Sequence, residues 1–260
     1  MSELHWKISD PARGKKVNKF LVVVPFYNVE EWIEKCINSI KGQNYDNFSC
    51  ILIDDISTDS SYEKCIRAVA DDNRFTVVKN KEKKYALKNI IEGINILNPQ
   101  DEDVIMTVDG DDWVYDSDVF KKVDDKYREA KCLITYGNYE RFPDGQLGHC
   151  SKYSNGIINN NAFRQDMWRA SHLRTFKYKL WKNIKDKDLL DNDGNYLDVA
   201  WDLAFMFPML EMAGERQECF SEPLYVYNMD NPNNDFKLKL EKQRMYDRMI
   251  RHRPRYERIE

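Results

Sequence analysis

Short apolar runs alternate with amphipathic stretches along the first half of this chain of 260 residues. Residues 20–24 form a continuous apolar run, as expected of a central strand covered on both faces, and Pro25 is predicted to end it. Further strands are predicted at residues 48–53, 75–78 and 103–108. Such an alternation predicts βαβ units, and therefore a mostly parallel sheet with helices on both faces.

Apolar side chains at helical spacing predict the helices between these strands. The first helix has one apolar face, made of Ile33, Cys36, Ile37 and Ile40. The second follows polar residues 57–61, which offer N-cap side chains, and its apolar positions are Tyr62, Cys65, Ile66 and Val69. The third has on one side Leu87, Ile90, Ile91, Ile94 and Leu97. One α/β domain over residues 17–230 accounts for this pattern.

Beyond Trp113 the alternation is less regular. A helix, a strand and a long polar loop are expected at residues 119–127, 132–139 and 142–161. Residues 200–212 predict an apolar helix that Pro208 should kink or interrupt. Residues 220–227 are expected to return to the sheet edge.

The two ends of the chain differ from the middle. Residues 1–16 are polar and aperiodic, which predicts a mobile leader. Residues 231–260 predict a basic helical tail, since nine basic residues face four acidic ones from Lys237 onward. We expect this helix to pack on the domain, and contact with a membrane or an acidic partner is the alternative.

Composition excludes some classes of partner. Forty basic against 44 acidic residues give a net charge of −4, which argues against binding to nucleic acid. The apolar runs are too short for a transmembrane segment and the N-terminus lacks a secretory pattern, so a cytoplasmic protein is expected. Six irregularly spaced cysteines without a C-x-x-C motif predict reduced thiols in the core.

Acidic residues follow the predicted strands. Asp54 and Asp55 come after the second strand, and Asp109, Asp111 and Asp112 come after the fourth. Ligands of an open parallel sheet bind beyond these strand ends. Carboxylates gathered there repel one another unless a cation compensates them, and hard oxygen ligands suit Mg²⁺ or Mn²⁺.

The usual glycine-rich phosphate loops are missing, since neither G-x-G-x-x-G nor G-x-x-x-x-G-K-[ST] occurs. A diphosphate would therefore be held by a metal ion and by basic side chains. The metal would stabilise the diphosphate as it leaves.

Three motifs together resemble glycosyltransferase family 2, whose GT-A fold has a Rossmann-like sheet. They are Val24-Pro-Phe-Tyr-Asn28, Ile53-Asp-Asp-Ile-Ser-Thr-Asp-Ser60 and Val108-Asp-Gly-Asp-Asp-Trp113. A fourth, Tyr85-Ala-Leu-Lys-Asn89, is similar to a helix start of the family but has Lys88 in place of the usual arginine. The resemblance extends over about residues 20–227 and is strongest before Trp113.

This resemblance implies roles for single residues. Nucleotide contacts fall on Pro25, Phe26, Tyr27, Asp54, Asp55, Lys88 and Asp109. Which of Asp54 and Asp55 contacts the base stays open. Metal ligation falls on Asp109 and Asp111, and Asp112 is expected to support them or to cap a helix.

The family also implies a late acidic residue that deprotonates the acceptor, often in a Glu-Asp pair before an apolar helix. That pair is not intact here. Asp202 directly precedes the apolar run and is the first candidate, and Asp198 is the reserve. The alternative for Asp202 is an N-cap role.

Sugar or acceptor contacts are expected between the metal motif and that helix, at His172, Arg174 and Trp181. Ordinary packing or surface exposure is the alternative for these residues. Lone histidines are more often structural than ligating, so His149 and His172 stay outside the predicted metal set.

The sequence thus predicts a glycosyltransferase, hexosyltransferase-like, that binds a nucleotide-diphosphate sugar with Mn²⁺ or Mg²⁺. The resemblance implies transfer to a hydroxyl of a glycan or other acceptor with inversion at the anomeric carbon. A sugar-nucleotide pyrophosphorylase is disfavoured because its glycine-rich N-terminal loop is missing. A catalytically silent nucleotide-sugar-binding protein of the same fold is the remaining alternative.

Overall fold

The computed structural model describes residues 17–232 and 239–260. The predicted leader, residues 1–16, and part of the predicted tail lie outside the described residues. The strands are β1 (Phe20–Phe26), β2 (Phe48–Asp54), β3 (Phe75–Lys79), β4 (Val104–Thr107), β5 (Trp113–Val114), β6 (Ile134–Phe142), β7 (Arg174–Lys177) and β8 (Gln217–Asn228).

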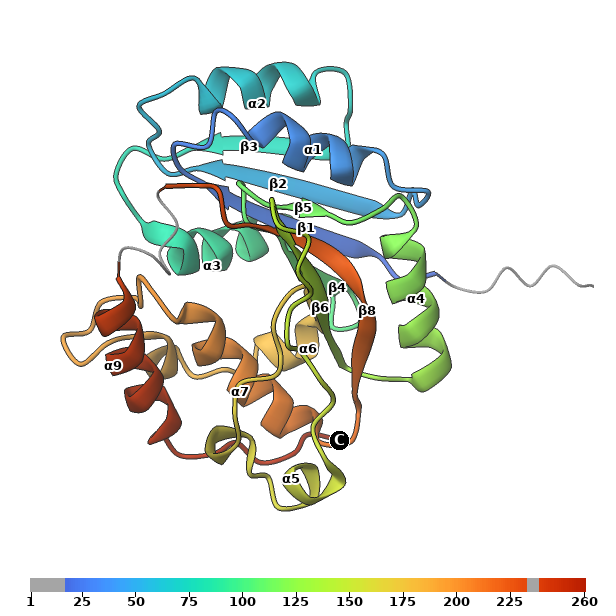
Figure 1. Ribbon diagram of the computed structural model, residues 1–260, viewed down its shortest axis with the longest axis vertical. Helices are drawn as coiled ribbons and strands as arrows, with labels where there is room; N and C mark the ends of the chain where they lie inside the picture. Colours follow the sequence, from blue (N-terminus) through green and yellow to red (C-terminus); the bar gives the residue numbers. More distant parts are fainter. Residues whose placement is uncertain (1–16, 233–238) are drawn as a thin grey trace, which may run out of the picture.

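Helices connect these strands and cover them (Figure 1). The α-helices are α1 (Ile33–Lys41), α2 (Ser61–Val69), α3 (Tyr85–Leu97), α4 (Val119–Ala130), α5 (Asn155–Asn159), α6 (Tyr178–Trp181), α7 (Trp201–Ala213) and α9 (Leu240–Arg251). Two short 3₁₀ helices are η1 (Phe163–Gln165) and η2 (Asp186–Leu189).

Within the described residues the strands form one eight-stranded sheet in the order β3-β2-β1-β4-β7-β6-β8-β5. Strands β1 to β4 pair in parallel, and β7 is antiparallel to both of its neighbours. Strands β6 and β8 are again parallel. The expected α/β fold with a mostly parallel sheet is confirmed.

Successive side chains of β1 point to opposite faces of the sheet and belong to two separate hydrophobic cores, one on each face. Leu21 and Val23 belong to the core formed with α3, α7 and α9. Phe20, Val22 and Val24 belong to the core formed with α1, α2 and α4. Because both faces are covered, the strand is apolar at every position, as the sequence predicted.

The prediction that Pro25 ends the first strand is wrong, because β1 continues to Phe26. The carbonyl of Pro25 accepts from the backbone N–H of Gly110 on the β4 side, where β4 has already ended at Thr107. The missing N–H of proline faces the same side, so its absence costs no ladder hydrogen bond.

The interruption expected as one outcome at Pro208 does not occur, because α7 runs continuously from Trp201 to Ala213. This helix is buried on nearly all sides, and its tertiary packing outweighs the backbone hydrogen bond that proline cannot donate. Ile66 differs as well, since α2 turns it outward with 43% of its surface exposed. No helix in the described residues combines the length and apolarity needed to cross a membrane.

The C-terminal helix α9 packs against α7 and completes one core with Tyr246 and Ile250. A buried ion pair supports this arrangement: Arg164 binds Glu211 of α7 through two hydrogen bonds of 2.6 and 2.8 Å. Arg164 also donates to the carbonyl of Ile250 at 2.7 Å. Helix α9 is therefore packed into the domain beside α7.

Candidate functional site

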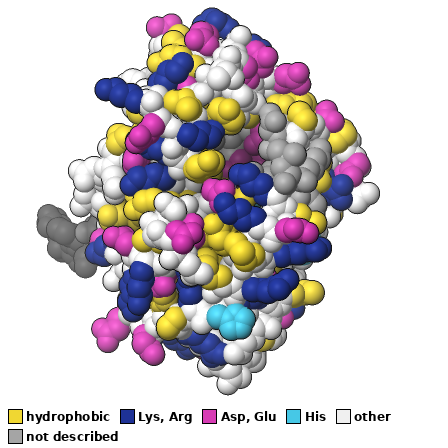
Figure 2. All heavy atoms as spheres, turned by 90° about the vertical axis from the view of Figure 1, so that its left-hand side faces the viewer, with side chains coloured by type: hydrophobic (Ala, Val, Ile, Leu, Met, Phe, Trp, Pro, Cys, Tyr) yellow, Lys and Arg dark blue, Asp and Glu magenta, His cyan; other side chains and the backbone are white. Residues whose placement is uncertain are grey.

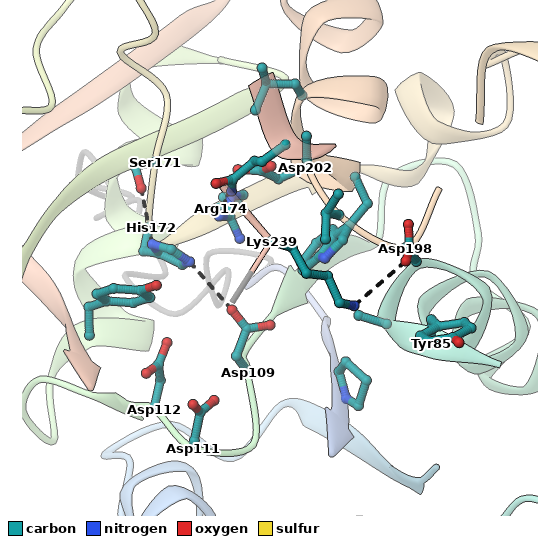
Figure 3. A pocket seen from close by; sticks show the side chains of 18 of the residues that line it. Tyr85, Asp109, Asp111, Asp112, Ser171, His172, Arg174, Asp198, Asp202 and Lys239 are labelled. Carbon is teal, nitrogen blue, oxygen red and sulfur yellow. Dashed lines mark hydrogen bonds and ion pairs between the residues drawn. The ribbon is translucent and has the colours of Figure 1, made fainter. Parts of the chain in front are cut away.

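A cavity of about 900 Å³ opens beyond the C-terminal ends of β1, β2 and β4. Its lining includes most of the residues singled out in the sequence: Pro25, Phe26, Tyr27, Asp55, Asp109, Asp111, Asp112, His149, His172, Arg174, Asp198 and Asp202. Three others are not among the lining residues: Asp54, Lys88 and Trp181. The cavity thus brings together side chains from both halves of the chain (Figure 3).

Asp55 is the member of the Asp54-Asp55 pair that faces the cavity. Its carboxylate accepts hydrogen bonds from Asn80 Nδ2 and from the backbone N–H groups of Lys84 and Tyr85, at 2.8 to 2.9 Å. Burial alone would raise the pKa of Asp55, but these donors outweigh it and hold the pKa below its ordinary value. Asp55 therefore carries a fixed negative charge just beyond the C-terminal end of β2.

Lys88 lies outside the cavity, 3.7 Å from Glu92 and over the ring of Tyr196. Lys83, which belongs to none of the sequence motifs, lines the cavity instead. Lys83 Nζ lies 3.3 Å from Asp55 and 2.8 Å from the ring centroid of Tyr27. Only its place in a lysine-rich loop after β3 could have indicated this position.

A cluster of two carboxylates and one imidazole lies at the end of β4, with Asp112 and His172 buried and Asp109 partly exposed. Ligand atoms of Asp109, Asp112 and His172 all fall within 4.8 Å of one another. His172 Nε2 is 3.5 Å from Asp109 Oδ2. Neither His172 Nε2 nor Asp112 Oδ2 has a hydrogen-bond partner, although both atoms are buried. Unpaired buried atoms of this kind indicate a group that the site is built to bind.

Charge in this cluster is poorly compensated. Burial, together with the neighbouring charges of Asp111 and Asp109, raises the pKa of Asp112 well above its ordinary value. Burial raises the pKa of Asp109 too, but the interaction with His172 and the charge of Arg174 bring it below the ordinary value. Burial and Arg174 lower the pKa of His172, so its imidazole is neutral at neutral pH and can ligate a metal.

Asp111, a predicted metal ligand, lines the same cavity beside this cluster. Its Oδ2 accepts a hydrogen bond of 2.7 Å from Asn231 Nδ2. Asp112, expected only to support or to cap, instead points into the cluster while its Oδ1 accepts from the backbone N–H of Asn228 at 2.8 Å. Histidine 172, which lay outside the predicted metal set, completes the group.

Asp202 lies in the first turn of α7, across the cavity from Asp111 and Asp112 (Figure 3). Arg174 Nη2 donates to its Oδ2 over 3.0 Å, and Arg174 is itself buried. The N-cap position of α7 belongs to Ala200, and no capping hydrogen bond from a side chain is present there. The expected alternative of an N-cap role for Asp202 therefore has no support in the geometry.

Asp198, the reserve base, is tied to the C-terminal helix. Lys242 donates to its carboxylate at 2.8 Å, and Lys239 Nζ lies 3.6 Å away. Trp181 is 92% buried in the core, where its ring stacks on Phe176, so its position gives no support to a sugar contact.

Strained backbone borders the cavity. Tyr85 and Ala200 line it with φ of 62° and 50°, and Ile56 follows Asp55 with φ of 61°. Such conformations are costly for residues other than glycine, above all for a β-branched side chain, and they concentrate at functional sites. Figure 2 shows basic side chains around the hollow on this face of the molecule.

Comparison with known proteins finds a matching family model and similar sequences. Residues 21–189 match the sequence model described as "Glycosyl transferase family 2". Glycosyltransferase GlyA of Streptococcus pneumoniae is 28% identical over 221 residues, which cover 82% of this chain and 31% of GlyA. The uncharacterized glycosyltransferase EpsJ of Bacillus subtilis is 24% identical over 218 residues, covering 82% of this chain and 61% of EpsJ. The chain thus spans less than two thirds of either relative.

Solved structures share the fold. S. aureus TarS 1–349 in complex with UDP-GlcNAc superposes with a TM-score of 0.63 at 17% identity, over 83% of this chain and 60% of TarS. The mannosyltransferase PcManGT from Pyrobaculum calidifontis, in complex with GDP-Man and Mn²⁺, superposes with a TM-score of 0.58 at 16% identity, over 96% of this chain and 66% of PcManGT. The expected GT-A fold is confirmed.

Proposed function

Because this chain belongs to glycosyltransferase family 2, we propose that it transfers a hexosyl group from a nucleotide-diphosphate sugar to an acceptor hydroxyl. One observation carries the proposal. The acid–imidazole cluster of Asp109, Asp112 and His172 shares a cavity with Asp202, and Asp202 lies across that cavity from Asp112. A leaving diphosphate and a general base need such opposite positions in an in-line displacement.

The chemistry of the cluster fits a divalent cation. Two carboxylates suit Mg²⁺ or Mn²⁺, and an imidazole nitrogen favours the transition metal of the two. The orphaned Nε2 of His172 and Oδ2 of Asp112 are the atoms such an ion would satisfy. Asp111 can contribute through its second oxygen or through water. When bound, Mn²⁺ would supply positive charge to the departing diphosphate.

The nucleotide fits at the ends of β1 and β2. Tyr27 is 41% exposed beside the cavity and offers an aromatic face, with Pro25 and Phe26 next to it. Asp55 faces the cavity and Asp54 is fully buried away from it, which favours Asp55 as the carboxylate near the base. Lys83, rather than Lys88, supplies a cation on this side.

Asp202 is the base in this proposal. The acceptor oxygen forms a bond to the anomeric carbon while the bond from that carbon to the diphosphate oxygen breaks. The hydroxyl proton passes to the carboxylate of Asp202, and the nucleoside diphosphate leaves with the bonding electron pair. A single displacement of this kind inverts the anomeric configuration. Arg174 holds the carboxylate in place through its 3.0 Å hydrogen bond.

Calorimetric titration with UDP-sugars and GDP-sugars, with Mn²⁺ and then with excess chelator, tests donor binding. Detection of free nucleoside diphosphate tests turnover. We expect one donor to bind only with metal and to be consumed, and NAD and ATP to bind more weakly. Donor binding without any turnover would favour the catalytically silent alternative. Tight metal-free binding of NAD would contradict the proposal.

A further inference from the structure

The C-terminal helix α9 forms one wall of the cavity. Its lining residues are Lys239, just before the helix, and Gln243, Arg244, Asp247 and Arg251. These residues lie beyond residue 189, where the match to the family's sequence model ends. The wall is therefore supplied by a part of the chain that the family match does not cover.

This wall is anchored rather than loosely placed. Lys242 binds Asp198 near one end of α9, and Arg251 at the other end donates to the carbonyls of Arg164 and Asp166 at 2.9 and 2.7 Å. Tyr246 is buried between these contacts. A rigid wall loses little entropy when a ligand binds, so it can contribute to specificity.

Half-buried indole rings face the cavity near this wall. Trp168 lines the cavity and packs edge-on against Phe207, whose ring also lies 5.1 Å from the guanidinium of Arg251. Trp201 lines the cavity next to Asp202. Amphipathic aromatic faces beside polar groups such as Gln243 suit a sugar ring, which has apolar faces and a rim of hydroxyls.

The cations that line the cavity differ in how their charge is compensated, and Arg244 of α9 is the exception. Arg174, Lys239 and Arg251 each pair with an aspartate of the cavity. Arg244 is exposed toward the cavity, and among the described residues no hydrogen bond or ion pair satisfies its guanidinium. Guanidinium groups bind phosphate and carboxylate groups through two parallel hydrogen bonds.

We propose that the α9 wall is the acceptor subsite and that its ligand is an anionic saccharide, with a sugar ring on Trp168 and a phosphate or carboxylate group on Arg244. This inference rests on the proposed function for its meaning as an acceptor site. The bound saccharide would present a hydroxyl to Asp202, which lines the same cavity.

Binding of oligosaccharides matched in length tests the proposal, with neutral, phosphorylated and uronic-acid-bearing members measured by calorimetry on the full chain. One series contains UDP and Mn²⁺, and one contains neither. We expect at least one anionic class to bind about tenfold or more tightly than the neutral one, and the two anionic arms identify which group is recognised. Equal binding of all three classes, or no binding in either series, would overturn the proposal.

Variants locate the subsite. Arg244→Gln should remove the preference for the anionic saccharide, while Arg248→Gln, one turn further along α9 and outside the cavity lining, should keep it. Trp168→Ala should weaken all saccharides about tenfold, and Trp168→Phe should restore part of the affinity. Equal losses in the Arg244 and Arg248 variants would contradict the assignment. The affinity for UDP with Mn²⁺ should be the same in all these variants as in the wild type. A wild-type protein that does not bind UDP or another nucleoside diphosphate with Mn²⁺ would instead count against the proposed function.

Discussion

His172 Nε2 and Asp109 Oδ2 lie 3.5 Å apart, close enough to interact electrostatically and too far apart for a good hydrogen bond. Asp112 joins them with a buried oxygen that has no partner. Three ligand atoms are thus held near one another without being satisfied by one another. Such an arrangement can hold a divalent cation among the three atoms.

Adding Mn²⁺ should raise the melting temperature of the wild type, and chelator should reverse the rise. At 100 times its Kd the ion would add about 2.7 kcal/mol to the free energy of unfolding. Asp112→Asn should abolish this response and should also stabilise the metal-free protein, because asparagine does not ionise and so avoids the cost that burial, Asp111 and Asp109 impose on ionisation of Asp112. Differential scanning fluorimetry measures both effects.

His149→Gln is the matched control for the metal site, since His149 lines the cavity but is not part of the cluster. It should keep the full response to Mn²⁺. A metal-free Asp112→Asn protein that melts below the wild type and still responds fully to Mn²⁺ would show that the cluster does not hold the ion.

Asp55 yields a prediction on pH. Its folded pKa lies below the ordinary value of about 3.9, so its contribution is fully present above that value and is lost as the pH falls through the folded pKa. Asp55→Asn should therefore lower the free energy of unfolding by about 3 kcal/mol at pH 7, because the three donors around this side chain lose their charged acceptor. The difference in free energy of unfolding between the wild type and Asp55→Asn should become smaller below pH ~4.

Urea unfolding at several pH values measures that gap. Asp46→Asn serves as the control because the Asp46 side chain is fully exposed, and it should change stability by less than about 0.5 kcal/mol. A gap for Asp55→Asn that stays constant from pH 7 to pH 3 would contradict the assigned charge state.

The order of the elements was predictable because local periodicity decides it. The face of α1 with Ile33, Cys36, Ile37 and Ile40 is buried as expected. Pro25 was misjudged because the effect of proline depends on which neighbour its missing N–H would face, and that neighbour, β4, begins some eighty residues later.

The site was predictable as a region but not atom by atom. Asp111 and Asp112 are adjacent in sequence, and contacts from Asn231 and Asn228, over a hundred residues away, decide which carboxylate points into the cluster. Nothing in the sequence around His172 indicated metal binding, because a lone histidine is more often structural than ligating. The α9 wall was foreseen as a packed helix, whereas its approach to the cavity depends on Asp198 and Arg164.

Ile56 provides a prediction on stability. Its φ of 61° is unfavourable for a β-branched residue, and glycine adopts it freely. Ile56→Gly should therefore raise the free energy of unfolding by about 1 kcal/mol. Ile66→Gly, in the exposed face of α2, should lower it by a similar amount because glycine disfavours helix. Urea unfolding of both variants should show opposite signs, and a loss in both would mean that packing of Ile56 outweighs its strain.

The last prediction concerns the general base. Asp202→Asn should lower turnover by about two to four orders of magnitude, the usual worth of a positioned base, while donor affinity changes little. Stability should fall as well, because Arg174 is buried and would lose its charged partner. Turnover is therefore measured well below the melting temperature of each variant.

Asp198→Asn is the matched variant, since Asp198 also lines the cavity and also pairs with cations. It should loosen α9 and weaken saccharide binding, and turnover at saturating acceptor should stay within a few fold of the wild type. Donor hydrolysis by water provides a second measurement, because it needs the base but not the α9 wall. Near-normal transfer in Asp202→Asn together with loss of both reactions in Asp198→Asn would move the base to Asp198. Equal, large losses of donor affinity in both variants would instead mean that these carboxylates hold the cavity together and that neither takes the proton.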